Sequence, residues 1–226
     1  MIIAIDGPAG SGKSSVAKII AQKLQFRHVN TGAMYRAVAL KARQLNRDLG
    51  DEGQVAEVAR KQNIEFIPGA SGQAIVLDGE DVTSLLRSEQ VDQDAAIVAS
   101  LGEVREILVA KQRDMEKTGS IVMEGRDIGT VVFPQAERKF FLDATPEERG
   151  KRRFQELQAK HQEVDVDTII EQIRQRDEKD RNREVSPLIQ AKDAIYIDTT
   201  NFKLEEVVEQ ILESIEQLHT KIINRK

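Results

Sequence analysis

The fold is decided by residues 7–14, Gly7-Pro8-Ala9-Gly10-Ser11-Gly12-Lys13-Ser14, which match the pattern G-x-x-x-x-G-K-[ST] in full. An apolar, β-branched run at residues 2–5 precedes this stretch, and residues 13–25 carry apolar side chains at helical spacing. Glycines let backbone N–H groups approach phosphate oxygens, and the positive end of the helix dipole faces the same anion. The sequence therefore predicts a strand, a phosphate-binding loop (P-loop) and a helix that together bind a nucleoside triphosphate.

The residue types in this loop indicate how the triphosphate is held. We expect Lys13 to reach the β- and γ-phosphates and the Ser14 hydroxyl to bind Mg²⁺. The alternative is a glycine-rich turn that binds no ligand, but the motif and its strand–helix context agree. Glu124, at the end of an apolar run, is the nearest candidate for an acidic group beside the metal ion. The loop residues expected to bind ATP are Gly7, Pro8, Ala9, Gly10, Ser11, Gly12, Lys13, Ser14 and Ser15.

Composition narrows the classes of protein to which the chain can belong. Its 226 residues suffice for one α/β domain with a modest insertion, and the absence of cysteine excludes disulfides and thiolate metal sites. The net charge of −5 argues against nonspecific nucleic-acid binding, which usually needs a basic surface. The sequence has neither the apolar run of about 18 residues that a membrane span needs nor the features of a signal peptide. We therefore expect a cytoplasmic protein that binds neither nucleic acid nor membrane.

The rest of the chain alternates between helical and strand patterns. Such alternation indicates a mostly parallel sheet covered by helices on both faces, which is an α/β fold. The sequence predicts a helix that begins near Thr31, with Thr31 as its N-cap. The patterns predict further strands over residues 120–124, 139–142 and 194–197, and helices over residues 31–45, 51–62, 101–117, 146–159, 166–183 and 204–218.

One segment departs from this alternation. The apolar runs at residues 64–67 and 74–77 flank the turn-rich loop at residues 68–72. Two short strands around such a loop predict an antiparallel hairpin. The hairpin would be an insertion beside the parallel sheet, and the alternative is an elaborated edge of that sheet.

Arginines follow the loop in four places, and they suit phosphoryl transfer because the guanidinium binds phosphate bidentately. Arg126 and Asp127 come directly after the strand over residues 120–124, where ligands bind in open α/β sheets. The alternative for that pair is an ion pair that stabilises a loop. The other places are Tyr35-Arg36, Arg105, and a charged stretch in which Arg176, Asp180 and Arg183 share one helical face. A solvated helix with internal ion pairs is the alternative for that stretch.

Several functional classes remain compatible with a P-loop. The sequence has no Asn/Thr-Lys-x-Asp element of switch GTPases and no basic track of helicases. These observations favour a kinase that transfers the γ-phosphate to a small acceptor. Two alternatives stay open: a P-loop kinase of another nucleotide or metabolite, and a nucleotide-binding regulator that acts through a protein partner.

Together these residues resemble the bacterial cytidylate kinases, of the nucleoside monophosphate kinase family, over nearly the whole chain. The most specific segment is Gly125-Arg126-Asp127 with its continuation to Pro134. The other matching segments are residues 5–8, 31–36, 180–183 and 187–188. Two positions differ from many relatives, because Asn30 stands where Asp is common and Thr31 where Ser also occurs.

The resemblance implies a three-layer P-loop fold with a five-stranded parallel sheet, a helical LID, and a CMP-binding region with a small antiparallel insert. We expect one kinase domain over residues 1–226. Its CORE would comprise about residues 1–30, 100–150 and 190–226, its CMP-binding region residues 31–99, and its LID residues 151–187. The implied reaction is the Mg²⁺-dependent phosphorylation of CMP or dCMP by ATP, carried out by a monomer.

The resemblance also assigns roles to individual residues. It implies that Lys13, Arg126, Arg176 and Arg183 are catalytic and that Arg152 and Arg176 approach the ATP phosphates. The residues that match CMP-binding positions are Thr31, Tyr35, Arg36, Arg105, Arg126, Asp127, Asp180 and Arg183. Asp127 and Asp180 would contact the base or the sugar.

Overall fold

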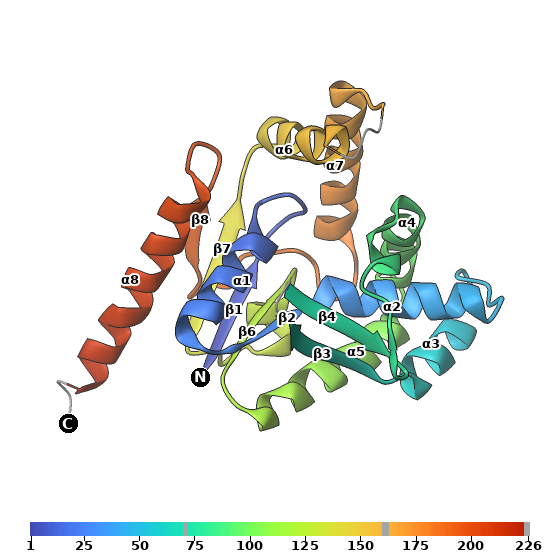
Figure 1. Ribbon diagram of the computed structural model, residues 1–226, viewed down its shortest axis with the longest axis horizontal. Coiled ribbons are helices and arrows are strands. Elements are labelled where there is room, and N and C mark those ends of the chain that lie inside the picture. The colour runs from blue at the N-terminus through green and yellow to red at the C-terminus, as the bar shows by residue number, and fades with distance from the viewer. Residues whose placement is uncertain (70–71, 160–162, 224–226) are drawn as a thin grey trace. The chain divides into compact units, whose positions relative to one another are not determined.

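The computed structural model describes residues 1–69, 72–159 and 163–223 and divides the chain into two compact units (Figure 1). The first unit comprises Met1–Arg27 and Ser120–Lys226, and the second comprises His28–Gly119. Residues 70 and 71 of the predicted hairpin loop and residues 160–162 of the predicted LID lie outside the described residues. The second unit extends to Gly119, although the sequence division placed residues 100–119 with the CORE.

The main sheet has five strands in the order β2-β6-β1-β7-β8. The pairs β1–β6, β1–β7 and β7–β8 are parallel. Every residue of β1 and of β6 is buried, as expected for central strands with helices on both faces. The predicted α/β class and parallel sheet are therefore confirmed. The strand bounds are β1 Ile2–Asp6, β2 Arg27–Asn30, β6 Ile121–Gly125, β7 Arg138–Asp143 and β8 Ile195–Asp198.

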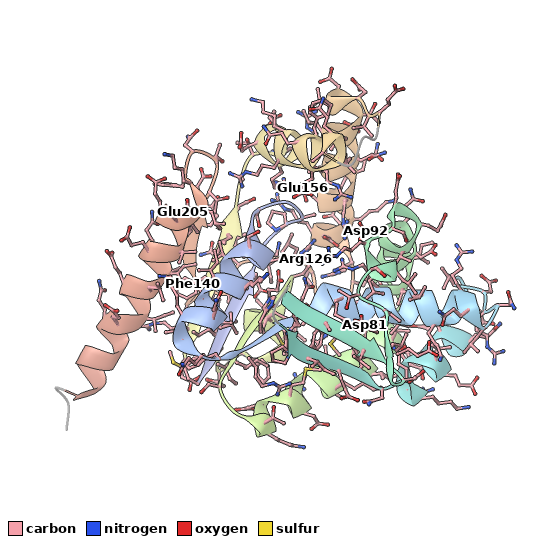
Figure 2. All side chains as sticks on the ribbon, in the orientation of Figure 1. Asp81, Asp92, Arg126, Phe140, Glu156 and Glu205 are labelled. Atoms are coloured by element: carbon pink, nitrogen blue, oxygen red, sulfur yellow. The ribbon has the colours of Figure 1, made fainter. Side chains whose placement is uncertain are left out.

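Helices α1 (Lys13–Leu24) and α8 (Leu204–Ile223) pack against this sheet and enclose the core of the first unit. Phe140 on β7 belongs to this core together with aliphatic residues of both helices (Figure 2). Burial of each large apolar side chain contributes roughly 1.5–3 kcal/mol to folding. The core therefore holds the strand that precedes the P-loop and the helix that follows it in fixed positions.

Helices α6 (Pro146–Gln158) and α7 (Val166–Asn182) pack against each other in the first unit (Figure 1). Thr145 caps α6 and Asp165 caps α7, and each side chain accepts a hydrogen bond from a backbone N–H of the first turn. Gly150 permits the close approach of the two helices, because a Cβ there would overlap the Ile170 side chain. These are the two helices predicted from residues 146–159 and 166–183.

The second unit combines helices with a small separate sheet. The hairpin of β3 (Ile64–Gly69) and β4 (Gly72–Leu77) is antiparallel, and β5 (Glu80–Asp81) adds a third strand. The predicted hairpin is therefore confirmed, and the alternative of an elaborated edge of the main sheet is wrong because the two sheets are distinct. The helices of this unit are α2 Thr31–Gln44, α3 Glu52–Lys61, α4 Glu89–Val98 and α5 Gly102–Asp114, with short 3₁₀ turns at Leu85–Arg87 and Met115–Thr118.

Three local features differ from the sequence expectations. The N-cap of α2 is Asn30 and not Thr31, because the Asn30 side chain accepts a hydrogen bond from Ala33 N at 3.1 Å. Strand β2 was not predicted, since Val29 is its one buried residue and gives no alternating pattern. Helix α4 was not predicted either, although its buried residues Val91, Ala95 and Val98 lie at helical spacing.

Candidate active site

Two glycines of the P-loop have left-handed backbone conformations. Gly10 and Gly12 have φ values of 77° and 89°, which side chains other than glycine rarely adopt. Gly12 is the N-cap of α1, and none of the described side chains caps this helix. The first backbone N–H groups of α1 are therefore available to an anion, as in helix N-termini that bind phosphate.

Lys13 is folded back over the loop. Its Nζ donates to Pro8 O at 2.5 Å and to Ser11 Oγ at 3.3 Å, and the residue is 6% exposed. Burial lowers the pKa of Lys13 well below its ordinary value, and the nearby positive charge of Arg126 lowers that pKa further. A phosphate anion at the loop would favour the charged ammonium again. The electrostatics of the loop therefore suit a negatively charged ligand.

Ser14 and Glu124 place two oxygen groups beside the loop. The Ser14 hydroxyl donates to Glu124 Oε2 at 2.6 Å, and Glu124 is 3% exposed at the end of β6. Within residues 1–69, 72–159 and 163–223, no group of three or more histidine or acidic side chains could hold a metal ion. Mg²⁺ bound with a nucleotide is usually coordinated by water, by phosphate oxygens and by only one or two protein oxygens. A hydroxyl beside a carboxylate can supply those protein oxygens.

Asp6 connects the strand before the P-loop to the segment after Asp127. Its two carboxylate oxygens accept hydrogen bonds from Ile128 N at 2.8 Å and from Gly129 N at 2.7 Å. These bonds hold the start of a π-helical turn, Ile128–Val132. Burial raises the pKa of Asp6 to about 7, although the two N–H donors oppose the shift. Sequence analysis missed Asp6, because a carboxylate before a glycine loop also fits an ordinary turn residue.

Arg126, Asp180 and Arg183 form one cluster in the first unit. Arg126 Nε donates to Asp180 Oδ2 at 2.9 Å, and Arg183 Nη1 lies 3.5 Å from Asp180 Oδ1. Burial opposes ionisation of Asp180, but the adjacent Arg126 and Arg183 outweigh it and hold the pKa of the carboxyl below its ordinary value. Arg176 also lowers the pKa of Asp180 and of Lys13, so its charge lies near both. The predicted arginine cluster is thus assembled, with Arg183 as the C-cap of α7 rather than inside it.

Two arginines of α6 contact the loop region, and only one of them was predicted. Arg152 donates to Thr199 O at 2.6 Å, and the Thr199 hydroxyl donates to Ser11 O at 3.2 Å. Arg152 is therefore connected to the P-loop by hydrogen bonds through one residue, Thr199. Arg149 donates directly to Ala9 O at 3.1 Å. Arg149 was missed because a single arginine on a charged helix resembles a solvated side chain.

The second unit contains four of the eight residues predicted to bind CMP. Arg105 lies over the Tyr35 ring, with its guanidinium carbon 5.4 Å from the ring centroid, and it is 2% exposed. Arg36 Nη1 lies 3.4 Å from Asp92 Oδ1, and Thr31 is buried in the first turn of α2. Asn30 serves this site as the cap of α2. Thr31, Tyr35, Arg36 and Arg105 therefore form one group within this unit.

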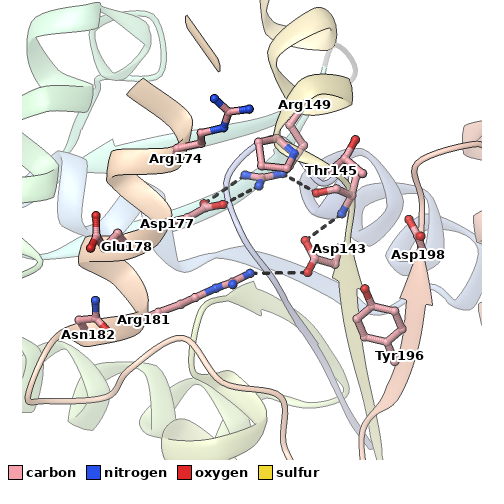
Figure 3. Close-up of a pocket in the computed structure, with 12 residues that line it drawn as sticks. Asp143, Thr145, Arg149, Arg174, Asp177, Glu178, Arg181, Asn182, Tyr196 and Asp198 are labelled. Carbon is pink, nitrogen blue, oxygen red and sulfur yellow. Dashed lines mark hydrogen bonds and ion pairs between the residues drawn. The ribbon is translucent and has the colours of Figure 1, made fainter. Parts of the chain in front are cut away.

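A hollow of about 500 Å³ lies between α6, α7 and the ends of β7 and β8 (Figure 3). Its lining contains none of the residues assigned to ATP or CMP from the sequence. Arg181 Nη2 lies 3.8 Å from Asp143 Oδ2, and Tyr196 stacks on Phe141 with 6.2 Å between ring centroids. The cluster of Arg126, Asp180 and Arg183 is not part of this lining.

Comparison with known proteins identifies the family. The sequence model of cytidylate kinase matches residues 3–217. The chain belongs to the cytidylate kinase family. Cytidylate kinase of Carboxydothermus hydrogenoformans is 50% identical over 95% of this chain and 97% of its own length. Cytidylate kinase of Bacillus subtilis strain 168 is 47% identical over 95% and 96%.

Among solved structures, an uncharacterized protein from Eubacterium ventriosum ATCC 27560 shares the fold. The TM-score is 0.52 at 18% sequence identity, and the match covers 96% of this chain and 98% of the other. Among the described residues, no helix is both long and apolar enough to cross a bilayer. The resemblance read from Gly125-Arg126-Asp127 and its neighbours is thus confirmed at the level of the family.

Proposed function

We propose that this cytidylate kinase family member transfers the γ-phosphate of ATP to CMP and dCMP, which yields ADP and CDP or dCDP. The observation that carries this proposal is near-full-length similarity to proteins named cytidylate kinase, and it is supported by a complete P-loop motif whose glycines have left-handed backbone angles. The reaction is a direct in-line transfer without a covalent enzyme intermediate. The acceptor is already an anion at pH 7, so the enzyme needs no strong general base.

ATP binds at the loop over Gly7–Ser15. Backbone N–H groups of the loop and of α1 hold the phosphates, and Lys13 swings from Pro8 O to the β- and γ-phosphates. Arg152 is connected to the loop by hydrogen bonds through Thr199, and its positive charge contributes to ATP binding. These groups position the donor and stabilise its charge, which are the main sources of catalysis in phosphoryl transfer.

Mg²⁺ accompanies ATP in this proposal. The Ser14 hydroxyl would hold the ion, and Glu124, which accepts the Ser14 hydrogen bond, would be its acidic partner. The ion would neutralise charge that develops on the phosphates. The small number of protein oxygens fits a metal that arrives with the nucleotide.

The residues proposed to bind CMP are Thr31, Tyr35, Arg36 and Arg105 in the second unit and Arg126, Asp127, Asp180 and Arg183 in the first. Arg126, Arg176 and Arg183 serve the acceptor phosphate or the transition state, since a guanidinium spreads its charge over several oxygens. Asp127 and Asp180 hydrogen-bond the base or the sugar. The assignment is supported by the charges that surround Asp180 and by the stacked Arg105–Tyr35 pair.

The division into CORE, CMP-binding region and LID stays a prediction, and so do the monomeric state and the cytoplasmic location. In this scheme the LID comprises about residues 151–187. Its closure would exclude water and limit wasteful hydrolysis of ATP.

A panel of acceptors tests the function. Purified protein is mixed with Mg-ATP, and ADP formation is followed with CMP, dCMP, UMP, AMP, GMP and dTMP in separate reactions. We expect fast turnover with CMP and dCMP and weak turnover with the others, because an acceptor site that hydrogen-bonds the cytosine amine rejects bases that lack it. Equal rates with all acceptors would contradict the cytosine assignment, and no turnover with any of them would contradict the kinase assignment.

A further inference from the structure

Arg149 is a fully buried arginine beside the P-loop, and none of the roles above uses it. Its side chain is 1% exposed. Nε donates to Ala144 O at 2.8 Å, and Nη1 donates to Ala9 O and to Asp177 Oδ1, each at 3.1 Å. Nη2 donates to Asp177 Oδ2 at 2.5 Å, so all three nitrogens of the guanidinium are engaged (Figure 3). A buried charge is tolerated only with such complete pairing.

The acceptors of Arg149 come from three different parts of the first unit. Ala144 precedes α6, Ala9 is in the middle of the P-loop, and Asp177 is on α7. Asp177 directly follows Arg176, and it precedes Asp180 by one helical turn. One helix therefore presents Asp177 to Arg149 and Asp180 to Arg126.

The contact between Arg149 and the P-loop is close as well as polar. A Cβ on Gly10 would lie 3.1 Å from Arg149 Cβ, which is tighter than most such contacts. Gly10 thus leaves the space in which the stem of Arg149 passes the loop. The position of the loop and the position of this side chain depend on each other.

We propose that Arg149 is a positioning residue that fixes the P-loop relative to α7, so that the ATP-binding loop and the arginines of α7 are set together. This inference rests on the proposed function of those arginines. The planar guanidinium can serve a loop carbonyl, a strand-end carbonyl and a carboxylate at once. Lysine has a single nitrogen and a different geometry, so it can keep the charge but cannot hold all three partners.

Other contacts hold α6 against α7 without touching the loop. Arg174 Nη2 lies 2.5 Å from Glu147 Oε1, and this ion pair also joins the two helices. Gly150 and Ile170 pack between them. Loss of the Arg149 network should therefore leave α6 and α7 together and loosen their contact with the P-loop, to which Arg152 stays connected through Thr199.

Two carboxylate-to-amide variants test this proposal as a matched pair. Asp177→Asn weakens the partner of Arg149, and Glu147→Gln weakens the partner of Arg174; each removes one charge between α6 and α7. We expect kcat with CMP to fall about 10- to 100-fold in Asp177→Asn and in Arg149→Lys, since small misplacements of catalytic groups cost that much. The KM for ATP should change less than about threefold, because the loop itself still binds phosphate. Glu147→Gln should keep both constants near those of the wild type.

A double-mutant cycle separates positioning from a loss of folded protein. If Arg149 acts through α7, adding Arg149→Lys to Arg176→Ala should lower kcat little beyond Arg176→Ala alone. If Arg149→Lys lowers kcat by the same factor with and without Arg176→Ala, the proposal is overturned, because Arg149 would then act independently of α7. A kcat loss that matches the loss of folded molecules in a thermal melt would overturn it too.

Hydrogen exchange in the ligand-free protein tests the coupling without any acceptor. Asp177→Asn should speed amide exchange in peptides that cover residues 7–14, although residue 177 does not touch the loop, and Glu147→Gln should not. Unchanged exchange at the loop in Asp177→Asn would overturn the inference. Because this measurement uses no substrate, it stands or fails separately from the acceptor panel.

Discussion

Arg126 Nε donates to Asp180 Oδ2 over 2.9 Å, and this bond joins the segment after β6 to the last turns of α7. The carboxylate also lies beside Arg183, so the two arginines share one negative charge. The cluster of two arginines and one aspartate carries a net positive charge, which would attract a phosphate group. It also keeps both guanidinium groups in place before the acceptor arrives, which lowers the reorganisation that catalysis requires.

Arg126→Ala should therefore weaken both acceptor binding and turnover. The charge that Arg126 faces persists from the bound acceptor into the transition state, so KM for CMP should rise and kcat should fall, the latter by about 10²- to 10³-fold. The fold should survive, because Arg183 still pairs with Asp180. Steady-state kinetics with varied CMP and varied ATP check this. An effect confined to the KM for ATP would contradict the assignment.

Lys13→Ala should abolish most of the turnover and leave the fold intact. The ammonium makes its contacts inside the P-loop, to Pro8 O and Ser11 Oγ, and burial already lowers its pKa, so its loss removes an unfavourable buried charge from the ligand-free protein. We expect a fall of several orders of magnitude in kcat/KM with a thermal midpoint at or above that of the wild type. Activity assays and a thermal melt on the same preparation check this. A near-normal rate in the folded variant would refute the mechanism.

The sequence predicts the parts of this protein whose chemistry is local. The P-loop needs glycines at fixed places, and its strand and helix lie directly beside it, so the motif predicts the local geometry as well as a phosphate ligand. The helices α6 and α7 follow from spacing of apolar residues and from their caps. The arginine cluster was recognised because Arg126 follows a strand end and because Asp180 and Arg183 lie within one turn of each other.

The missed features depend on partners far away in the sequence. Asp6 binds N–H groups 122 and 123 residues later, and Arg149 binds a carbonyl 140 residues earlier. Neither contact has a periodic or spacing signature. Thr31 was assigned as the N-cap because it precedes the apolar pattern, but Asn30 is an equally good cap, and the side-chain bond to Ala33 N is formed by Asn30. An asparagine keeps the capping function of the aspartate common at this position, since both side chains offer an acceptor oxygen.

The free energy of unfolding should depend on pH through Asp6. Its pKa is about 7 in the folded protein against an ordinary value of 3.8, because burial disfavours the charged form. Between these pH values the folded state keeps a proton that the unfolded state has released, so the contribution of Asp6 to stability falls as pH rises from about 4 to about 7. Urea unfolding of the wild type and of Asp6→Asn at pH 5 and pH 7.5 checks this sign.

Asp6→Asn should be less stable than the wild type at pH 5, because the amide offers one acceptor oxygen for two N–H donors. The variant should also lose less stability than the wild type between the two pH values, since its side chain stays neutral. Equal changes with pH in the two proteins would contradict a raised pKa at Asp6.

Gly150→Ala should destabilise the contact between α6 and α7. The new methyl group would overlap Ile170 Cγ1, and overpacking of this kind costs about 1–3 kcal/mol. Adding Ile170→Ala should recover part of the loss, since it removes the atom that clashes. Gly53→Ala in α3 is the control, because its methyl group would meet Asp51 Oδ1 at an ordinary 3.5 Å and alanine favours the helix. Chemical denaturation of the four proteins checks the order; a Gly150→Ala protein as stable as the wild type would contradict it.

The last prediction concerns Asp92, which lies on α4 within the second unit (Figure 2). Its Oδ1 is 3.4 Å from Nη1 of Arg36, an arginine proposed to bind CMP. Both side chains are partly exposed, at 29% and 24%. A long contact between two partly solvated charges is weak, so phosphate can compete with Asp92 for the guanidinium. The carboxylate also repels a phosphate dianion that binds beside it.

Asp92→Asn should therefore lower the KM for CMP by about two- to fivefold, in line with an ion pair worth up to about 1 kcal/mol, and leave kcat unchanged. The difference should shrink as ionic strength rises, because salt screens exposed charges. The control is Asp94→Asn, which disrupts a second ion pair between α2 and α4. Asp94 is 1% exposed and binds Arg43 through both oxygens at 2.7 and 2.8 Å, so that variant should lose stability and show no selective change in KM for CMP. A raised KM for CMP in Asp92→Asn would instead mean that Asp92 holds Arg36 in its binding orientation.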